Sequence, residues 1–489
     1  MRLSDRTLSS LHPSVRRPGY DRTAVRTGIV HLGIGAFHRA HGAVYTEEVL
    51  EAGDLGWGIL GASLRSPDTR DALAPQDGLY ALAVRDGTGD AVRVIGAVRD
   101  VLVAPEDPEA LLTAMTDPAI RIVSLTVTEK GYCHDPATSD LDRSLPDVAH
   151  DLANPSAPRS MPGFLVEAIA RRRAAGAAPF TVMSCDNVPA NGRVLARVLT
   201  ALARLRDPGL ADFIAAEIAC PSTTVDRIVP ATTDADRDHV ADLLGVEDAW
   251  PVTAEPFSQW VIEDRFPSGR PDWPGATFVA DVEPYEFMKL RLLNGSHSTM
   301  AYLGYLMGKE TIADAVAEPA MERLVRTLMD EEITPTLPLL AGFDLPAYKD
   351  QLFTRFRNPA LRHRTWQVAT DGSQKLPNRL LGPARERIAK GLPIGRIALG
   401  VAGWMRYATG LDEAGRPIDV RDPLAADLRD RASRAGRDPA RLAEAFLGIR
   451  AMFGEDLPRE ERFTGPVTRA LASLLERGAA ATVREAVGA

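Results

Sequence analysis

The amino-acid sequence predicts an α/β protein in which a parallel β-sheet domain is followed by a mostly helical domain. Three features lead to this expectation: strand-like and helical runs alternate in the first part of the chain, amphipathic helical runs dominate after about residue 284, and a glycine pair follows the first strand-like run. A chain of 489 residues is also too long for one ordinary hydrophobic core. We therefore expect two domains, residues 1–283 and residues 284–489.

The first half of the chain contains short apolar runs of the kind that form buried strands. These runs cover residues 28–37, 57–64, 92–98, 120–132 and 180–188. Helical runs such as 163–176 and 194–206 accompany them. Strands that alternate with helices imply a parallel sheet with helices on both faces.

The second half of the chain is dominated by amphipathic helical patterns with few strand signals between them. The clearest helical runs cover residues 321–340, 398–410, 438–454 and 466–487. We expect these segments to pack into a separate helical domain.

Composition argues against several kinds of protein. The net charge of −9 is unsuited to nucleic acid, whose phosphates need a basic surface. Three cysteines are too few for a disulfide scaffold, so we expect a cytoplasmic location. The nine histidines form no HxxxH motif, so we expect no metal site. No apolar run of about 18 residues appears, so we expect neither a signal peptide nor a membrane span.

A glycine loop follows the first strand-like run. Gly33 and Gly35 give the tight turn and bare backbone that a pyrophosphate needs at the start of a helix, although His38 stands where a third glycine is usual. A plain turn between a strand and a helix would look similar. Because strands and helices alternate around it, we favour a dinucleotide site, and we assign to it Gly33, Gly35, Ala36 and Phe37.

The residue that would contact the adenosine ribose is less clear. Asp68, after the second strand-like run, is the best candidate for the ribose hydroxyls. Arg65 and Arg70 lie close by and could instead accept a 2′-phosphate. NAD is the expected cofactor, and NADP stays open at this point.

Three polar residues interrupt an apolar run between residues 288 and 304. Lys289, Asn294 and His297 stand among leucines and methionines, where a buried ammonium is costly unless it is paired or loses its proton. On an α-helix, with Lys289 at zero, Glu286 falls at about 60°, His297 at about 80° and Asn294 at about 140°. All four side chains could therefore meet on one face.

This set suits alcohol oxidation without a metal. A lysine desolvated in an apolar pocket has its pKa lowered toward the working pH and can serve as the base for a hydroxyl proton. Asn294 can stabilise a developing alkoxide, His297 can orient the hydroxyl, and Glu286 can move the proton or shape the pocket. Taken singly, each residue has an ordinary alternative: a lysine that reaches solvent, a capping asparagine and a hydrogen-bonded core histidine.

The segment KLRLLNGSH, residues 289–297, resembles the K-x4-N-x2-H motif of the mannitol dehydrogenase family, the polyol-specific long-chain dehydrogenases. The resemblance covers nearly the whole chain and includes IVHLGIGAFHRAH, IVSLTVTEKGY, SCDNVPANG, TVDRIVP and DGSQKLPNR. Within the family, EPFSQWVIEDRFPSGRPDW, LRHRTWQVATDGSQKLPNRLL and ALGVAGWMRY are most similar to the fructuronate reductase branch.

This resemblance implies a Rossmann-type dinucleotide-binding domain at residues 1–283 and a helical substrate and catalytic domain at residues 284–489. It implies that Lys289 is the catalytic base, that Asn294 and Asn187 form an oxyanion hole, and that His297 binds substrate. It also places three further residues in the substrate pocket: Glu129, Asp226 and Lys375. A structural pair of Asp226 with Arg227 and a simple turn around Lys375 are the alternatives.

One position departs from the mannitol dehydrogenases. Gln367 stands where the resemblance places an arginine, and cations gather nearby at Arg362, His363, Arg364, Lys375 and Arg379. A uronate carries a carboxylate that a polyol lacks, and Lys375 or Arg379 could bind it. Ordinary surface charges are the alternative.

The residues predict an NAD-dependent, metal-independent oxidoreductase, and the family resemblance implies that it interconverts D-mannonate and D-fructuronate. A mannitol 2-dehydrogenase or another polyol dehydrogenase is the nearest alternative, and a catalytically idle dinucleotide sensor is a remote one. The expected partner is a small sugar acid or polyol, with no nucleic acid and no membrane, and the chain is expected as a monomer or a small homo-oligomer.

Overall fold

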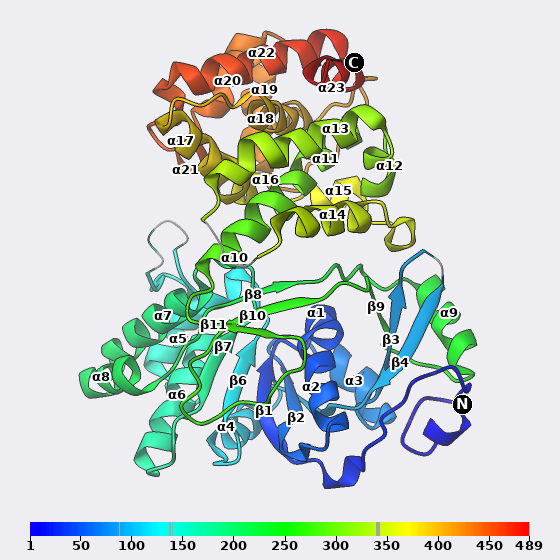
Figure 1. Ribbon diagram of the computed structural model, residues 1–489. Helices are drawn as coiled ribbons and strands as arrows, with labels where there is room; N and C mark the ends of the chain where they lie inside the picture. The colour runs from blue at the N-terminus through cyan, green and yellow to red at the C-terminus, as the bar shows by residue number, and fades with distance from the viewer. Residues whose placement is uncertain (88, 136–137, 139, 339–342, 489) are drawn as a thin grey trace. The chain divides into compact units, whose positions relative to one another are not determined.

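The structure, a computed structural model, describes residues 1–87, 89–135, 138, 140–338 and 343–488 (Figure 1). The chain divides into two compact units, Met1–Glu283 and Pro284–Ala489. The first unit is built around a parallel sheet and the second is helical, so the expected fold class is confirmed.

A five-stranded sheet with the order β5-β2-β1-β6-β7 forms the centre of the first unit. All of its neighbouring strands are parallel. The strands are β1 (Thr27–Leu32), β2 (Gly58–Ser63), β5 (Val98–Val103), β6 (Ile122–Leu125) and β7 (Thr181–Ser184). Along the chain, β2 and β5 are added on one side of β1, and β6 and β7 are then added on its other side. The carboxyl ends of β1 and β6 therefore form the switch point at which α/β sheets bind ligands.

Side chains that alternate along the strands cover both faces of this sheet. On β1, Val30 and Leu32 pack into one core and Ile29 packs into the other. The first core is closed by α4 (Pro108–Thr116), α5 (Pro146–Ala153), α6 (Met161–Ala174), α7 (Asn191–Arg206) and α8 (Pro208–Glu217). The second core includes α1 (Ala36–Ala40), α2 (Gly42–Glu51) and α3 (Asp68–Leu73).

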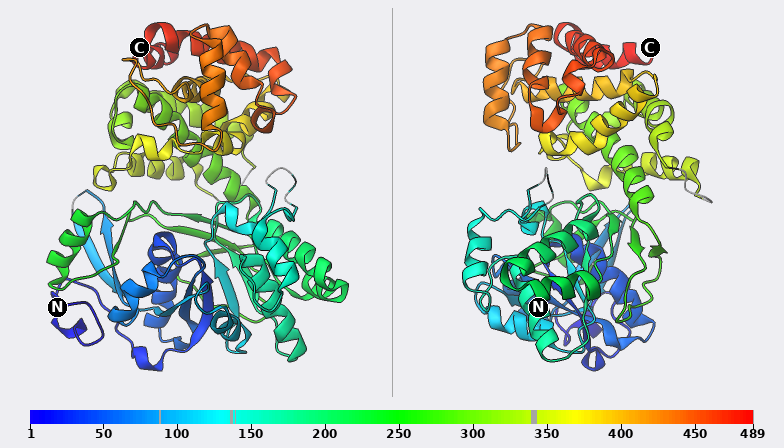
Figure 2. Two further views of the ribbon diagram at one scale, coloured as in Figure 1. Left: turned by 180° about the vertical axis from the view of Figure 1, so that it is seen from behind. Right: turned by 90° about the vertical axis from the view of Figure 1, so that its left-hand side faces the viewer.

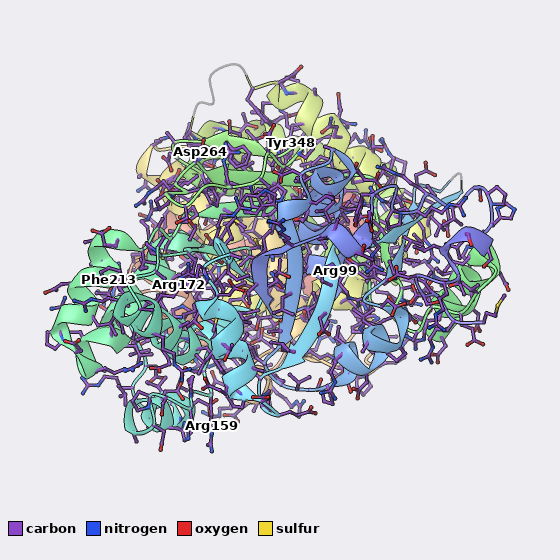
Figure 3. The ribbon with its side chains drawn as sticks, turned by 90° about the horizontal axis from the view of Figure 1, so that it is seen from below. Arg99, Arg159, Arg172, Phe213, Asp264 and Tyr348 are labelled. Atoms are coloured by element: carbon purple, nitrogen blue, oxygen red, sulfur yellow. The ribbon has the colours of Figure 1, made fainter. Side chains whose placement is uncertain are left out.

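Buried arginines complete the first core. Arg172 of α6, labelled in Figure 3, is only 3% exposed. Its guanidinium donates to the carbonyl oxygens of Met115 at 3.1 Å, Asp117 at 2.7 Å and Ala178 at 2.6 Å. These bonds fasten α6 to the end of α4 and to the loop before β7, because each otherwise unpaired carbonyl receives a donor.

Two smaller sheets were not expected from the sequence. One has the order β4-β3-β9 and the other β11-β10-β8. Their strands are β3 (Tyr80–Arg85), β4 (Asp90–Ile95), β8 (Thr223–Asp226), β9 (Val252–Ala254), β10 (Gln259–Glu263) and β11 (Thr277–Val279), and α9 (Asp234–Leu244) lies between β8 and β9 along the chain. The single strand expected at 92–98 is wrong, because the chain breaks at Gly96 and enters two different sheets as β4 and β5.

The second unit consists of helices joined by loops in both views of Figure 2, and its described residues contribute no strand to any sheet. The long helix α18 (Gly395–Ala408) is buried from Ile397 to Ala408, and α11 (Gly295–Leu306) and α22 (Glu461–Arg477) pack against it. The other α-helices are α10 (Glu283–Met288), α12 (Ile312–Val316), α13 (Pro319–Thr327), α14 (Leu345–Phe356), α15 (Thr365–Val368), α16 (Gly372–Leu376), α17 (Gly382–Ala389), α19 (Ala425–Ala435), α20 (Pro439–Leu447), α21 (Arg450–Phe453) and α23 (Ala479–Ala486).

Among the residues described in this unit, three short π-helical segments occur, at Lys289–Asn294, Leu328–Ile333 and Pro377–Leu381. The single helix expected at 321–340 is therefore not observed. This stretch of the chain instead forms α13, a π-helix and a 3₁₀ turn that ends at Thr336, and residues 339 and 340 lie outside the described part. Within the described ranges, no helix combines the length and apolar character needed to cross a membrane.

Candidate active site

The glycine loop connects β1 to α1 at the switch point of the main sheet. Gly33 has φ +89°, and a Cβ there would lie 2.2 Å from the carbonyl oxygen of Thr126, so only glycine fits. A Cβ on Gly35 would meet nothing closer than 3.9 Å, which leaves open space beside the loop. Ala36 and Phe37 begin α1, which has only five residues and is followed by a break at His41, after which α2 begins at Gly42.

A buried histidine supports this loop from the sheet side. His31 Nε2 lies 2.9 Å from Thr126 Oγ1, and that hydroxyl donates to the Gly33 carbonyl at 2.7 Å. Because the hydroxyl proton is used there, Nε2 must donate and Nδ1 must accept from Ser124 Oγ at 2.8 Å. Burial lowers the pKa of His31 to about 3, and its ring stacks on His38 at 3.3 Å. His31 was not among the residues expected from the sequence, where its only signal is a polar residue inside an apolar strand.

Asp68 is the first residue of α3 and is exposed. Its carboxylate accepts from Ser66 Oγ at 2.9 Å. Arg70 forms ion pairs with Asp71 at 2.7 Å and with Glu106. An arginine engaged with two carboxylates is less suited to a 2′-phosphate, so this arrangement favours NAD over NADP.

The three polar candidates of the first unit follow or end strands of two different sheets: β6 and β7 are neighbours in the main sheet, and β8 belongs to the sheet β11-β10-β8. Glu129 begins the 3₁₀ turn after β6, Asn187 follows β7, and Asp226 is the last residue of β8. Glu129 and Asn187 are exposed, whereas Asp226 is buried. The guanidinium of Arg227 donates to the carbonyl oxygens of Ala40 and Glu255.

The apolar run between residues 288 and 304, here called the lysine segment, is largely buried as the sequence suggested, but it is not a regular α-helix throughout. Lys289 is 5% exposed and His297 is 6% exposed. Residues 289–294 form a π-helix, which makes i→i+5 bonds, so the arc drawn with 100° per residue does not apply to them. Among the described residues, Asn294 Oδ1 is buried without a hydrogen-bond partner. Glu286 is half-buried on the preceding α10.

His297 is held neutral. Burial lowers its pKa well below the ordinary value, and electrostatic interactions with His363, Arg355 and Arg379 lower it further. Its ring lies 4.7 Å from that of Phe356 and 5.3 Å from that of His363. Its Nε2 is buried and bonds to no residue that the structure describes. A neutral imidazole of this kind can accept or donate one hydrogen bond to a ligand.

The cations near Gln367 separate into two groups. Arg362 and Arg364 both pair with Glu310, as ordinary surface charges do. Arg379 instead reaches the lysine segment, where it donates to Ser298 Oγ at 3.0 Å and lies 3.5 Å from the Asn294 carbonyl. Lys375 donates to Thr370 Oγ1 at 3.1 Å, with the Asp371 carboxylate 4.0 Å away.

Two residues of this region were missed by the sequence analysis. Arg355 and Phe356 end α14, and Arg355 is only 6% exposed. No pattern distinguishes an arginine near a site from a surface arginine in an amphipathic helix. The one available signal was the placement of Arg355 between Phe353 and Phe356.

Comparison with known proteins places this geometry in a family. A model described as the mannitol dehydrogenase Rossmann domain matches residues 27–275, and one described as the mannitol dehydrogenase C-terminal domain matches residues 281–475. This chain belongs to the mannitol dehydrogenase family. The predictions of the family and of a dehydrogenase that acts on a CH–OH group are therefore confirmed.

Several relatives within the mannitol dehydrogenase family are similar over almost their full length. D-mannonate oxidoreductase of Escherichia coli (strain K12) is 50% identical over 97% of this chain and 98% of its own. The uncharacterized oxidoreductase YeiQ of the same strain is 47% identical over 95% and 96%. The structure of Pseudomonas fluorescens mannitol 2-dehydrogenase, a ternary complex with NAD and D-mannitol, is 41% identical with a TM-score of 0.91 over 99% of both chains.

Proposed function

We propose that this chain is an NAD-dependent, metal-independent oxidoreductase that interconverts D-mannonate and D-fructuronate. The observation that supports this substrate most is the positive charge around His297. Arg379 lies at the lysine segment, and Lys375 and Arg355 raise the positive potential at His363. A sugar acid carries a carboxylate that such cations bind, whereas mannitol carries none. The 50% identity with D-mannonate oxidoreductase points the same way.

The proposed chemistry removes a hydride from the carbon and a proton from the hydroxyl of one CH–OH group. NAD, when bound, accepts the hydride. Lys289, which is buried, is proposed as the base that takes the proton. Asn294, with Asn187 assigned from the family resemblance, would donate to the developing alkoxide, and neutral His297 would hold the hydroxyl in place. The roles of Glu129, Asp226 and Glu286 in the pocket rest on the same assignment.

The dinucleotide is proposed to bind at the glycine loop with Gly33, Gly35, Ala36 and Phe37. The open space beside Gly35 fits a ligand that approaches the backbone closely. Asp68 is proposed for the ribose hydroxyls. The NAD complex of the Pseudomonas fluorescens relative supports NAD as the cofactor, and the ion pairs of Arg70 agree with it.

Metal independence is part of the proposal. Among the residues that the structure describes, no group of three or more histidine, cysteine, aspartate or glutamate side chains could hold a metal ion. In the proposed mechanism, Lys289 and the amide donors perform the tasks that a metal ion performs in other dehydrogenases.

Mannitol is the second candidate substrate, because the P. fluorescens relative was solved with D-mannitol. An NADH absorbance assay with mannonate, fructuronate, mannitol and fructose decides between the two. Turnover of mannonate and fructuronate alone supports the proposal, and turnover of mannitol and fructose alone contradicts it. A complete lack of turnover with bound NAD would favour the idle sensor. The division into a dinucleotide-binding domain at 1–283 and a substrate domain at 284–489, the cytoplasmic location and the oligomeric state remain predictions.

A further inference from the structure

Asp186 lies between two loops that carry site candidates in the first unit. It follows β7 and immediately precedes Asn187. Its carboxylate reaches across to the loop after β6. There Oδ2 accepts from the Val127 N–H at 3.2 Å, and Oδ1 accepts from the Thr128 N–H at 2.9 Å. The Tyr132 hydroxyl, which also bonds to Ser184 Oγ, donates to Oδ2 at 3.0 Å.

These bonds act where the backbone is strained. Thr128 has φ +64° and ψ 168°, a conformation that a residue with a Cβ rarely adopts unless its surroundings enforce it. Two successive N–H groups that point at one carboxylate provide such a constraint. Glu129 follows Thr128 directly, so the direction in which Glu129 leaves the sheet depends on this conformation.

A buried amide extends the same network to a third segment. Asn191, at the start of α7, is 1% exposed. Its Nδ2 donates to the carbonyl oxygens of Asp186 at 3.0 Å and Thr223 at 2.9 Å, and its Oδ1 accepts from the Thr223 N–H at 3.0 Å. Thr223 begins β8, the strand that ends at Asp226.

We propose that Asp186 is a positioning residue for the reaction proposed above, because its carboxylate holds the loop of Glu129 in a fixed place beside Asn187. This inference rests on the proposed function, but it concerns a residue that does not itself touch substrate. The backbone N–H groups of Val127 and Thr128 are the atoms through which Asp186 acts.

The charge state of Asp186 adds a pH dependence to this role. Burial raises its pKa to about 6, and the bonds from Thr128, Val127 and Tyr132 oppose that rise only in part. The other titratable groups that face it are Tyr132 and Cys185, which burial keeps neutral, and Glu129, whose charge raises the pKa of Asp186 further. A protonated carboxyl accepts these N–H groups less strongly. The hydrogen bonds by which Asp186 is proposed to fix the loop of Glu129 therefore weaken as the pH falls through about 6.

Asp186→Asn tests the proposal in the full-length protein, with Tyr132→Phe as the matched control. The asparagine keeps the size of the side chain but can accept at only one of its two ends, whereas Tyr132→Phe removes one bond and leaves both N–H bonds in place. We expect kcat to fall about 10–100-fold in Asp186→Asn, as small displacements in active sites do, with NAD affinity within about twofold of wild type. The control should lose about fivefold at most.

A rescue separates positioning from general stability. Glycine adopts a positive φ without strain, so Thr128→Gly should restore part of the rate when it is combined with Asp186→Asn. A double variant no faster than Asp186→Asn, or an NAD affinity that falls as far as kcat, overturns the proposal. If Asp186→Asn does not fold, the pH profile of kcat decides. An acid limb near pH 6 in wild type that weakens in Thr128→Gly supports the proposal, and identical profiles contradict it.

The same measurements keep this inference distinct from the proposed function. Wild-type turnover of mannonate or mannitol tests the substrate, and the ratio of variant to wild-type kcat on the substrate that is used tests Asp186. Wild-type activity on mannitol alone would therefore contradict the mannonate assignment and leave the Asp186 comparison intact.

Discussion

Replacing Arg379 by methionine should separate a substrate with a carboxylate from one without it. Arg379 donates to Ser298 Oγ at 3.0 Å and lies beside the Asn294 carbonyl, so its charge is held at the buried lysine segment. If this guanidinium binds the carboxylate of mannonate, Arg379→Met removes that interaction and leaves a side chain of similar length. Lys375→Met should act in the same direction.

The size of the effect follows from burial. A hydrogen bond to a charged group contributes about 1.5–3 kcal/mol, and 1.4 kcal/mol corresponds to about a tenfold change. Since Arg379 and Lys375 are half-buried, water screens their charge only in part. We expect kcat/KM for mannonate to fall roughly 10–100-fold in each variant, and kcat/KM for mannitol to change less than about threefold.

The assay compares kcat/KM for mannonate and mannitol in wild type and in each methionine variant. Arg364→Met is the matched control, because Arg364 belongs to the same cation-rich stretch but pairs with Glu310. The control should leave both values close to those of wild type. Equal losses on the two substrates in Arg379→Met and Lys375→Met would mean that these cations are structural. A wild-type preference for mannitol would refute the assignment of a sugar acid.

Three further outcomes are expected. Lys289→Ala should lower kcat about 10²–10⁴-fold with NAD affinity nearly unchanged, and a small primary amine should restore part of the rate; wild-type turnover in this variant would show that Lys289 is not the base. Activity should survive dialysis against EDTA, and a loss that zinc restores would contradict the lysine mechanism. The buried neutral His31, with a pKa of about 3 against 6.5 when unfolded, should cost stability as the pH falls from 6.5 toward 3, about 2 kcal/mol at pH 5. Urea unfolding of His31→Gln should show a smaller loss between pH 7 and pH 5, and an equal loss would exclude His31 as the cause.

The parts of the fold that the sequence predicts are those in which periodicity reflects burial. Strands β1, β2, β6 and β7 are buried on both faces, so each reads as a continuous apolar run. Strands β9 and β11 have only three residues each, which is too short for any pattern to appear. The break at Gly96 was missed because the packing of Arg22, Pro18 and Tyr20 around that glycine comes from a distant part of the chain.

In the candidate site, too, burial could be predicted from local sequence patterns, whereas features that depend on tertiary packing could not. The burial of Lys289 and His297 could be predicted, because both stand in an apolar run. The π-helix at Lys289–Asn294 could not, because an α-helix and a π-helix share the same residue preferences and tertiary packing selects between them. That packing includes the third π-helical segment, Pro377–Leu381, whose Arg379 carbonyl would lie 3.1 Å from a Cβ on Gly295. More than eighty residues separate Gly295 from Arg379 along the chain, and no local pattern connects them.

The charge distribution around His297 connects the proposed base with the proposed substrate. Burial lowers the pKa of His297, and positive charge from Arg355 and Arg379 lowers it further, because a second proton there would meet like charges in a buried place. The same positive potential favours every change that adds negative charge or removes positive charge nearby. It therefore favours binding of a carboxylate, formation of an alkoxide and loss of a proton from a lysine, which are three requirements of sugar-acid oxidation. A neutral polyol uses only the last two, so this arrangement fits both the alcohol chemistry of the family and the proposed preference for an acidic substrate.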